Sequence, residues 1–318
     1  MRRTSSGVCG RVSALIVVAA IGGSSISQLA QPRSVRLGGM RDDQRVDHLP
    51  DRITLTGVVR DFRADHPDFQ RQPKNAGGNT SFGHYAGIAA QTLGAEGTPV
   101  FRSKGHKVLD QWRNSEGARV MPGYEDAAYI SSRNGDRPGA TEAIGDAVES
   151  ADSFDQWFRD VSGVNLAKAV TITLNRDAGT TKYVFDDRTD PFYKDLGGFF
   201  PINGQLYGDY ERNTNSHFTF EIDTRFTYRK GRMQFFLFDG DDDVWVFIDG
   251  KLVIDLGGVH SRIDQRIELD RLTWLEDGKT YALKFFFAER HTTQSNFRIE
   301  TDLTLRSVTI PTASAMFD

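Results

Sequence analysis

The most regular alternation of apolar and polar residues lies between Val244 and Ile254. Two apolar runs are separated there by Asp249-Gly250, a dipeptide typical of a type I′ turn, which needs positive φ at both central positions. The pattern predicts a β-hairpin, and Trp245 on its first strand is expected to lie in the core. The residues expected on one shared face of the hairpin are Val244, Val246, Ile248, Leu252 and Ile254.

Runs rich in β-branched and aromatic residues recur from Ala169 onward, with turn residues roughly every ten positions. An early run of the same kind covers 53–62. Short strands at this spacing predict an all-β fold, an antiparallel β-sandwich of jelly-roll type, rather than alternating β/α units. Besides the hairpin, later strands are expected at 170–174, 182–185, 217–224, 233–238, 266–269, 280–287 and 297–305.

The pattern is weak from Gly77 to about Gly139, where glycines and scattered polar residues predominate. Long irregular segments are uncommon inside compact domains, so we expect a loop and short-helix elaboration on the core domain at about 77–165. One short helix is predicted at 85–93. A second is predicted at 153–161, because its apolar residues fall at i, i+3, i+4 and i+7 and would dock on a sheet.

The first 30 residues resemble a secretory signal peptide, with a basic start followed by an uncharged run from Val12 to Ile21. That run is too short to span a bilayer, and we expect no transmembrane segment. Residues 31–50 are polar and without periodicity, which predicts a linker. The remaining boundaries are expected to be a single domain at 51–308 and a C-terminal tail at 309–318.

Charge argues against several classes of partner. The chain has 318 residues with a net charge of −4, and loss of residues 1–30, which carry three Arg and no acid, leaves 36 basic against 43 acidic residues. A mildly acidic protein of this kind is a poor candidate for binding nucleic acid or anionic lipid. The single cysteine, Cys9, lies in the predicted signal peptide, so a mature chain would have no disulfide.

Four aspartates precede the hairpin within five positions, at 239, 241, 242 and 243. Like charges this close repel one another unless a cation or several donors neutralise them. An EF-hand loop is excluded, because counting from Asp239 puts Val244 at the glycine position and Gly250 at the final glutamate position. A calcium ion bound by oxygen ligands still fits. The alternative is a solvated acidic turn that keeps a sheet edge soluble.

Several stretches together resemble the fibro-slime domain family, within the wider superfamily of protective-antigen-type β-sandwiches that includes flocculin-type adhesins and accessory parts of glycosidases. The stretches that carry the resemblance are 54–62 with His66-Pro67-Asp68-Phe69, 154–164, 197–201, 238–260, and Ala288-Glu289-Arg290-His291-Thr292 with 295–297. They extend over most of the chain, from about Ile53 to Leu305.

The resemblance implies a lectin-like site at which two adjacent aspartates, joined by a cis peptide, bind Ca²⁺ and the calcium in turn binds sugar hydroxyls. The offset from Asp249-Gly250 assigns that pair to Asp241-Asp242, with Asp239 and Asp243 as secondary candidates. An asparagine from a later loop completes the adhesin site, and Asn296 is the candidate here. The residues expected to border the carbohydrate are Glu289, which can also ligate the cation, Arg290, His291 and His260.

Three functional classes follow. The first is a secreted, calcium-dependent carbohydrate-binding domain that recognises a glycan or cell-surface polysaccharide at the cell surface or in extracellular matrix. The second is a structural matrix protein in which calcium provides only rigidity. The third, a glycoside-processing enzyme, is disfavoured because the acids crowd onto one turn instead of flanking a cleft, and no nucleophile or phosphate-loop motif occurs. The sequence does not indicate an oligomeric state.

Overall fold

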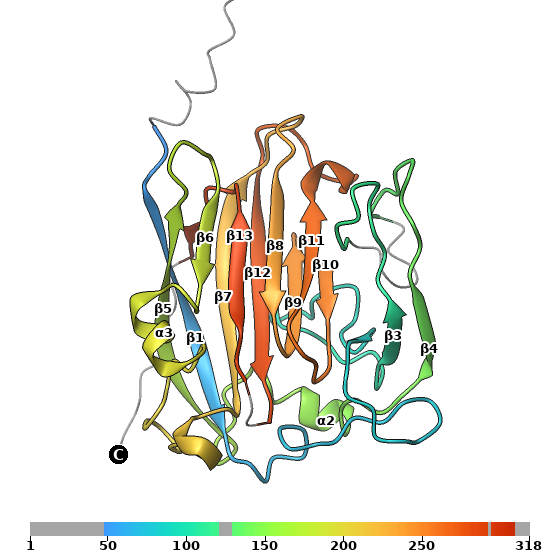
Figure 1. The fold of residues 1–318 in the computed structure, drawn as a ribbon, viewed down its shortest axis with the longest axis vertical. Helices are drawn as coiled ribbons and strands as arrows, with labels where there is room; N and C mark the ends of the chain where they lie inside the picture. Colours follow the sequence, from blue (N-terminus) through green and yellow to red (C-terminus); the bar gives the residue numbers. More distant parts are fainter. Residues whose placement is uncertain (1–47, 121–128, 292–293, 309–318) are drawn as a thin grey trace, which may run out of the picture. The chain divides into compact units, whose positions relative to one another are not determined.

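The computed structural model of the chain describes residues 48–120, 129–291 and 294–308, and its elements are labelled in Figure 1. The strands are β1 (Arg52–Phe62), β2 (Tyr85–Ala86), β3 (His106–Asp110), β4 (Ala140–Ile144), β5 (Asn165–Arg176), β6 (Tyr183–Asp186), β7 (Phe218–Thr227), β8 (Phe235–Gly240), β9 (Asp243–Ile248), β10 (Lys251–Leu256), β11 (Ile263–Glu268), β12 (Thr280–Glu289), β13 (Phe297–Thr301) and β14 (Arg306–Ser307). The short helices are α2 (Ala151–Phe154), α3 (Pro191–Leu196), η1 (Glu211–Asn213) and η2 (Leu269–Arg271).

The large sheet is antiparallel and follows the order β10-β9-β12-β7-β1-β5-β6-β13-β8-β11, with β14 paired to β7. Only two residue pairs join β5 to β6, and there the sheet folds over on itself. Phe238 of β8 lies 5.6 Å from Phe285 of β12, measured between ring centroids, although these strands are not neighbours in the sheet. The two halves therefore pack face to face, and the prediction of an all-β antiparallel sandwich is confirmed.

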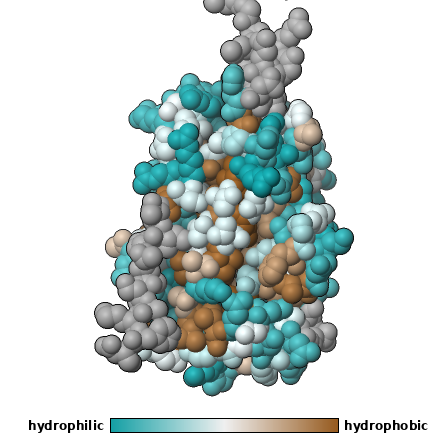
Figure 2. Space-filling model, turned by 90° about the vertical axis from the view of Figure 1, so that its left-hand side faces the viewer, coloured by the Kyte–Doolittle hydropathy of each residue, from teal (hydrophilic) through white to brown (hydrophobic). Residues whose placement is uncertain are grey.

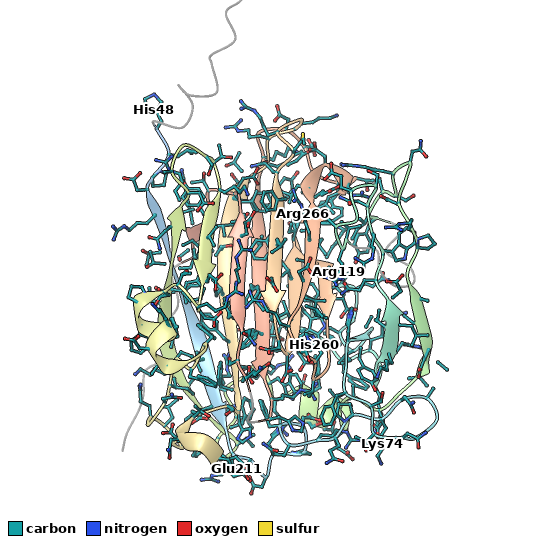
Figure 3. All side chains as sticks on the ribbon, viewed as in Figure 1. His48, Lys74, Arg119, Glu211, His260 and Arg266 are labelled. Atoms are coloured by element: carbon teal, nitrogen blue, oxygen red, sulfur yellow. The ribbon has the colours of Figure 1, made fainter. Side chains whose placement is uncertain are left out.

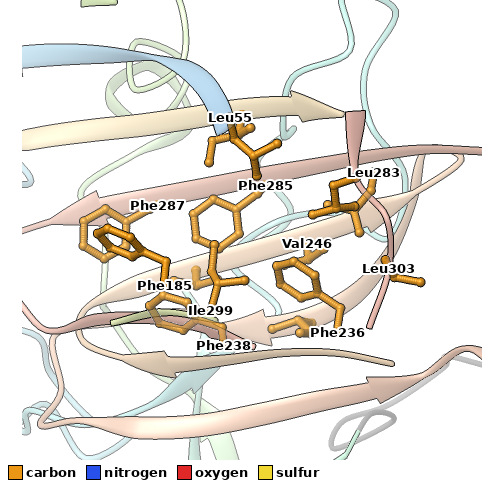
Figure 4. Close-up of a cluster of buried hydrophobic side chains, with 14 of the residues drawn as sticks. Leu55, Phe185, Phe236, Phe238, Val246, Leu283, Phe285, Phe287, Ile299 and Leu303 are labelled. Atoms are coloured by element: carbon orange, nitrogen blue, oxygen red, sulfur yellow. The ribbon is translucent and has the colours of Figure 1, made fainter. Parts of the chain in front are cut away.

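The main core fills the space between the two halves. Leu55 and Phe285 from one half meet Phe238 and Ile299 from the other, and each is at most 1% exposed (Figure 4). Phenylalanine dominates this core, and Phe297 stacks on Phe199 at 4.3 Å between centroids. Because aromatic rings bury large apolar areas, this core supplies much of the favourable free energy of folding.

The elaboration covers the outer face of β9, β10 and β12. A second cluster of buried side chains joins Trp157 and Phe158 to Trp245 of β9 and Phe286 of β12. A separate small sheet, in the order β2-β3-β4, lies within the elaboration. The β9 strand is consequently buried on both faces, which explains its continuous apolar sequence.

Both helices predicted in the elaboration differ from the structure. Tyr85–Ala86 is strand β2, because the Tyr85 N–H donates to the Gly257 carbonyl at 2.6 Å and ties this segment to the loop after β10. The helix predicted at 153–161 is reduced to α2, which Ser150 caps and which ends at Phe154. Its aromatic residues are buried as predicted, but they dock through successive turns that bring Trp157 and Phe158 against the sheet.

The predicted hairpin is confirmed by β9 and β10. Asp249 and Gly250 have φ of 51° and 76°, as a type I′ turn requires. The prediction for Leu252 is wrong, because the register shifts between Leu252 and Ile254. This bulge places Leu252 in the cluster under the elaboration, whereas Val253 and Ile254 both belong to the main core.

Figure 2 shows the side of the molecule that lies at the left in Figure 1. Hydrophobic side chains form patches on this side, and hydrophilic side chains separate the patches. No helix within the described ranges is long and apolar enough to cross a membrane. The predicted signal peptide and C-terminal tail lie outside the described residues, as does most of the predicted linker.

Candidate functional site

Strand register brings the predicted site residues together at one end of the sandwich. Gly240, the last residue of β8, pairs with Phe297 at the start of β13, so Asn296 stands beside Asp241. Ala288 of β12 pairs with Asp243 of β9 in the same way, so Glu289 stands next to Asp242. This end of β8, β10 and β12 points downward in Figure 1, and the labelled His260 marks it in Figure 3.

The Asp241-Asp242 peptide bond is cis, as the resemblance implied. Asn296 holds the Asp241 carboxylate from two directions, through its backbone N–H at 2.5 Å and its side-chain Nδ2 at 2.7 Å. The Asp241 N–H donates in return to the Asn296 carbonyl at 3.2 Å. Since the amide nitrogen is engaged in this way, the side-chain oxygen of Asn296 remains available as an acceptor.

Asp242 is 5% exposed and receives only backbone donors. The His260 N–H donates to Oδ1 at 2.9 Å and the Arg290 N–H donates to Oδ2 at 3.2 Å. These two donors fix the orientation of the carboxylate without bringing a positive side chain into contact with it.

Asp239 and Asp243 differ from this pair, because each is matched to an arginine. Arg262 binds Asp239 with two parallel hydrogen bonds of 2.9 Å. Arg290 binds Asp243 through Nε at 2.7 Å and Nη2 at 3.0 Å, and both side chains are 0% exposed. Bidentate pairs of this geometry neutralise the carboxylates locally.

Glu289 is the unusual residue of the site. Its side chain is fully buried, and neither carboxylate oxygen accepts a hydrogen bond from a residue that the structure describes. Ser295 lies close by, but its single hydroxyl proton is donated to the Phe199 carbonyl at 2.7 Å. A buried carboxylate without donors is costly and rare in folded proteins.

The negative charges of Asp241, Asp242 and Glu289 are therefore not neutralised by a contacting cationic side chain among the described residues. Burial and repulsion from neighbouring carboxylates raise the pKa of Asp242 well above its usual value, although Arg290 opposes the shift. Burial, followed by the charges of Asp242 and Asp241, raises the pKa of Glu289 in the same direction. Burial also raises the pKa of Asp241, despite the donors from Asn296. We call Asp241, Asp242, Glu289 and Asn296 the acidic site.

Among the described residues, no three His, Cys, Asp or Glu side chains are grouped as a ready-made metal centre. The chemistry of the acidic site nevertheless fits a hard cation. It offers three carboxylates and an amide oxygen, which are ligands that calcium prefers, and within the described ranges both oxygens of Glu289 lack a hydrogen-bond partner.

The remaining predicted residues surround the acidic site but point elsewhere. His260 is 7% exposed, and its Nδ1 lies 3.0 Å from the Ser261 carbonyl. Arg290 is 1% exposed and is committed to Asp243 and to the Ala147 carbonyl. The half-buried His291 places Nε2 at 2.8 Å from the Arg71 carbonyl. Trp245 is fully buried, as predicted, and donates to Asp255.

Residues 81–85 of the elaboration lie against the loop that borders the acidic site, and the sequence alone does not predict this. The Gly83 N–H donates to the Val259 carbonyl at 2.7 Å, and His84 Nε2 lies 2.8 Å from the Asp255 carbonyl. These contacts hold residues 81–85 along the loop that supplies His260. In both contacts the partner atom is a backbone carbonyl, so no motif in the sequence marks them.

Comparison with known proteins agrees with the fold. Residues 186–315 match the PA14 domain, and this segment contains β7 to β14 and the whole acidic site. The PA14 domain is a β-rich, protective-antigen-type, lectin-like domain.

The chain is also similar to proteins of Dictyostelium discoideum. It is 41% identical to protein psiQ over 172 residues, covering 50% of this chain and 16% of psiQ. It is 32% identical to protein psiH over 265 residues, covering 80% of this chain and 31% of psiH. For protein psiD the values are 31% over 262 residues, 80% and 42%. The chain thus spans less than half the length of these relatives.

Proposed function

We propose that this chain is a fibro-slime-type domain that binds carbohydrate with the help of calcium held at the acidic site. The match to the PA14 domain supports the lectin-like part of this proposal. The observation that carries the calcium part is Glu289, a fully buried carboxylate with no hydrogen-bond donor among the described residues. Beside it lie two further buried carboxylates, Asp241 and Asp242, which no cationic side chain in the described ranges contacts.

The residues that would hold the cation are Asp241, Asp242 and Glu289, with the amide oxygen of Asn296. Bound calcium would supply positive charge and additional coordination positions suited to sugar hydroxyls. The chain itself fixes the ligands beforehand, through Asn296 for Asp241 and the backbone of His260 and Arg290 for Asp242. Such preorganisation lowers the entropic cost of binding.

The ion pairs beside the acidic site have a supporting role in this proposal. Arg290 neutralises Asp243 and also donates to the Ala147 carbonyl at 3.0 Å, which ties the end of β12 to the elaboration. We infer that Arg290, His291 and His260 shape the site through their backbone and packing, since the Arg290 guanidinium, His291 Nε2 and His260 Nδ1 already have partners.

We further propose a secreted protein that acts at the cell surface or in extracellular matrix on a glycan or cell-surface polysaccharide, and that has no catalytic activity. Support for the location is the basic and then apolar start of the sequence. Support for a binding role is the crowding of the acids in one buried cluster, because a glycosidase needs two carboxylates placed across a cleft.

A structural matrix protein is the second candidate, and the depth of the acidic site favours it. Asp241, Asp242 and Glu289 are 3%, 5% and 0% exposed. Calcium enclosed by protein oxygens would stabilise the fold without reaching a sugar.

A glycan array probed with and without calcium separates the candidates. The full chain is expected to bind at least one glycan in calcium and to lose the signal in chelator. Asp242→Asn should abolish the signal, because it removes one negative charge from the acidic site. The matched control is Asp239→Asn, since Asp239 belongs to the same acidic run, near the end of β8, but pairs with Arg262. Calcium binding without any glycan signal would favour the structural candidate.

A further inference from the structure

Phe82 is an exposed aromatic residue at the rim of the acidic site. Its side chain is 47% exposed, although it lies in the elaboration, far from the aspartates in sequence. A single exposed apolar side chain is ordinary on a protein surface, so the case for Phe82 rests on where its contacts place it. Two contacts fix where this ring stands.

The first contact is with the segment that follows β12. The Phe82 ring packs edge-on against the His291 ring, with centroids 5.3 Å apart and an interplanar angle of 79°. His291 follows Arg290, whose N–H donates to Asp242 Oδ2. The ring of Phe82 therefore stands beside one of the two backbone donors of Asp242.

The second contact is with the loop that follows β10. Gly83, the next residue, donates its N–H to the Val259 carbonyl at 2.7 Å. Val259 precedes His260, whose N–H is the other donor to Asp242. Phe82 thus bridges the two segments that orient the Asp242 carboxylate.

Hydrogen bonds anchor the backbone of Phe82 and of the preceding residue, Ser81. Lys107 Nζ donates to the Phe82 carbonyl at 2.9 Å and also binds the Ser81 hydroxyl. The Ser81 N–H donates to the Pro73 carbonyl at 2.7 Å. A ring that is exposed while its backbone is anchored loses little entropy when a ligand packs on it.

We propose that Phe82 is a specificity-determining residue on which a hexopyranose ligand stacks its apolar C–H face while hydroxyls at its edge reach the acidic site. This inference rests on the proposed carbohydrate-binding function and adds the class of sugar and the residue that selects it. An aromatic face favours ligands with a flat apolar surface and excludes extended or highly charged polymers that lack one.

The test uses methyl glycosides of glucose, galactose and mannose as probes, with the full chain in saturating calcium. At least one probe is expected to bind, and Phe82→Ala should weaken it roughly tenfold, the effect of losing one aromatic contact. Phe82→Tyr should restore binding. Met233→Ala is the control, since Met233 is 76% exposed and precedes β8 at the end opposite the acidic site.

Two further readouts separate stacking from a structural role. Calcium affinity should be the same in all four proteins. Saturation of aromatic protons in an NMR transfer experiment should reach the sugar C–H protons in the wild type and not in Phe82→Ala. Binding by Phe82→Ala within about twofold of the wild type, or no binding of any probe by the wild type, would overturn the inference. The glycan array tests the proposed carbohydrate-binding function separately.

Discussion

Two groups of buried carboxylates in this molecule differ in how their charge is balanced. In the paired cluster, Arg271 at η2 donates to both oxygens of Asp136, at 2.6 and 2.9 Å, and to Glu268 at 2.7 Å. Arg271 is 1% exposed, and the side chain of Asp136 is 3% exposed. The acidic site is at least as deeply buried, yet no cationic side chain among the described residues contacts its carboxylates.

The paired cluster shows how this chain buries acids for structure alone. Glu268 also receives Asn114 Nδ2 at 2.9 Å and Arg133 at 3.0 Å, so each of its oxygens has a donor. The hydrogen bond from Arg271 lowers the pKa of Asp136. In contrast to this cluster, Glu289 has no hydrogen-bond donor among the described residues, and we propose that a ligand balances it, because an unbalanced buried charge is costly.

Asp61 illustrates a third solution. It is fully buried and receives the Tyr207 N–H at 2.7 Å. Burial raises the pKa of Asp61 to about 6, so this acid approaches neutrality by taking up a proton. Asp136 is thus paired with a cation, whereas Asp61 takes up a proton as the pH falls through about 6, and we propose that the acidic site is balanced by a bound cation.

The largest expected effect comes from removing the cation of the paired cluster. Arg271→Met should lower the free energy of unfolding by about 3–5 kcal/mol, because it removes the guanidinium from the buried carboxylate of Asp136 and leaves Glu268 with only Asn114 and Arg133. Urea denaturation measures this loss. The double variant Arg271→Met/Asp136→Leu should recover much of it. A loss below about 1 kcal/mol, which is the contribution of a surface ion pair, would contradict the view that the carboxylates of the paired cluster require a cation.

The next effect concerns pH. The folded-state pKa of Asp61, about 6, lies above its ordinary value of 3.8, so below pH 3.8 both folded and unfolded chains are protonated there. As pH rises from 3.8 to 6, the unfolded chain ionises first, and the folded protein loses up to about 3 kcal/mol of stability at this residue, at about 1.36 kcal/mol per pKa unit.

Asp61→Asn should remove that loss, because the amide oxygen still accepts the Tyr207 N–H. The variant should match the wild type near pH 4 and be more stable at pH 7. Subtracting the two urea-denaturation profiles cancels other titrating groups, such as Asp302 with its pKa raised by burial to about 6 and His217 with its pKa lowered by burial to about 4. Parallel profiles across this range would contradict the assignment.

The comparison also shows what the sequence can predict. Most strands follow from alternating apolar residues, and the Asp249-Gly250 turn has the backbone conformation that this dipeptide favours. Leu252 was placed on the wrong face because a bulge shifts the register within β10, and no residue there marks a bulge. The helix predicted at 85–93 failed because tertiary hydrogen bonds from the loop after β10 outweighed local propensity.

The acidic site was predictable in part. Asp241, Asp242 and Asn296 follow from the resemblance, and the structure places them in contact. The separation of Asp239 and Asp243 into ion pairs was not predictable, because Arg262 and Arg290 carry no motif that names their partners. Phe82 was missed for a similar reason, since backbone contacts from a weakly patterned segment bring it to the site.

The central claim is that calcium balances the acidic site, and urea unfolding in chelator and then in calcium tests it most directly. At a calcium concentration one hundred times the dissociation constant, the free energy of unfolding should rise by about 2.7 kcal/mol. Glu289→Gln should show a much smaller increase, while Asp239→Asn should respond as the wild type does. An unfolding free energy that is the same in chelator and in calcium would contradict the account.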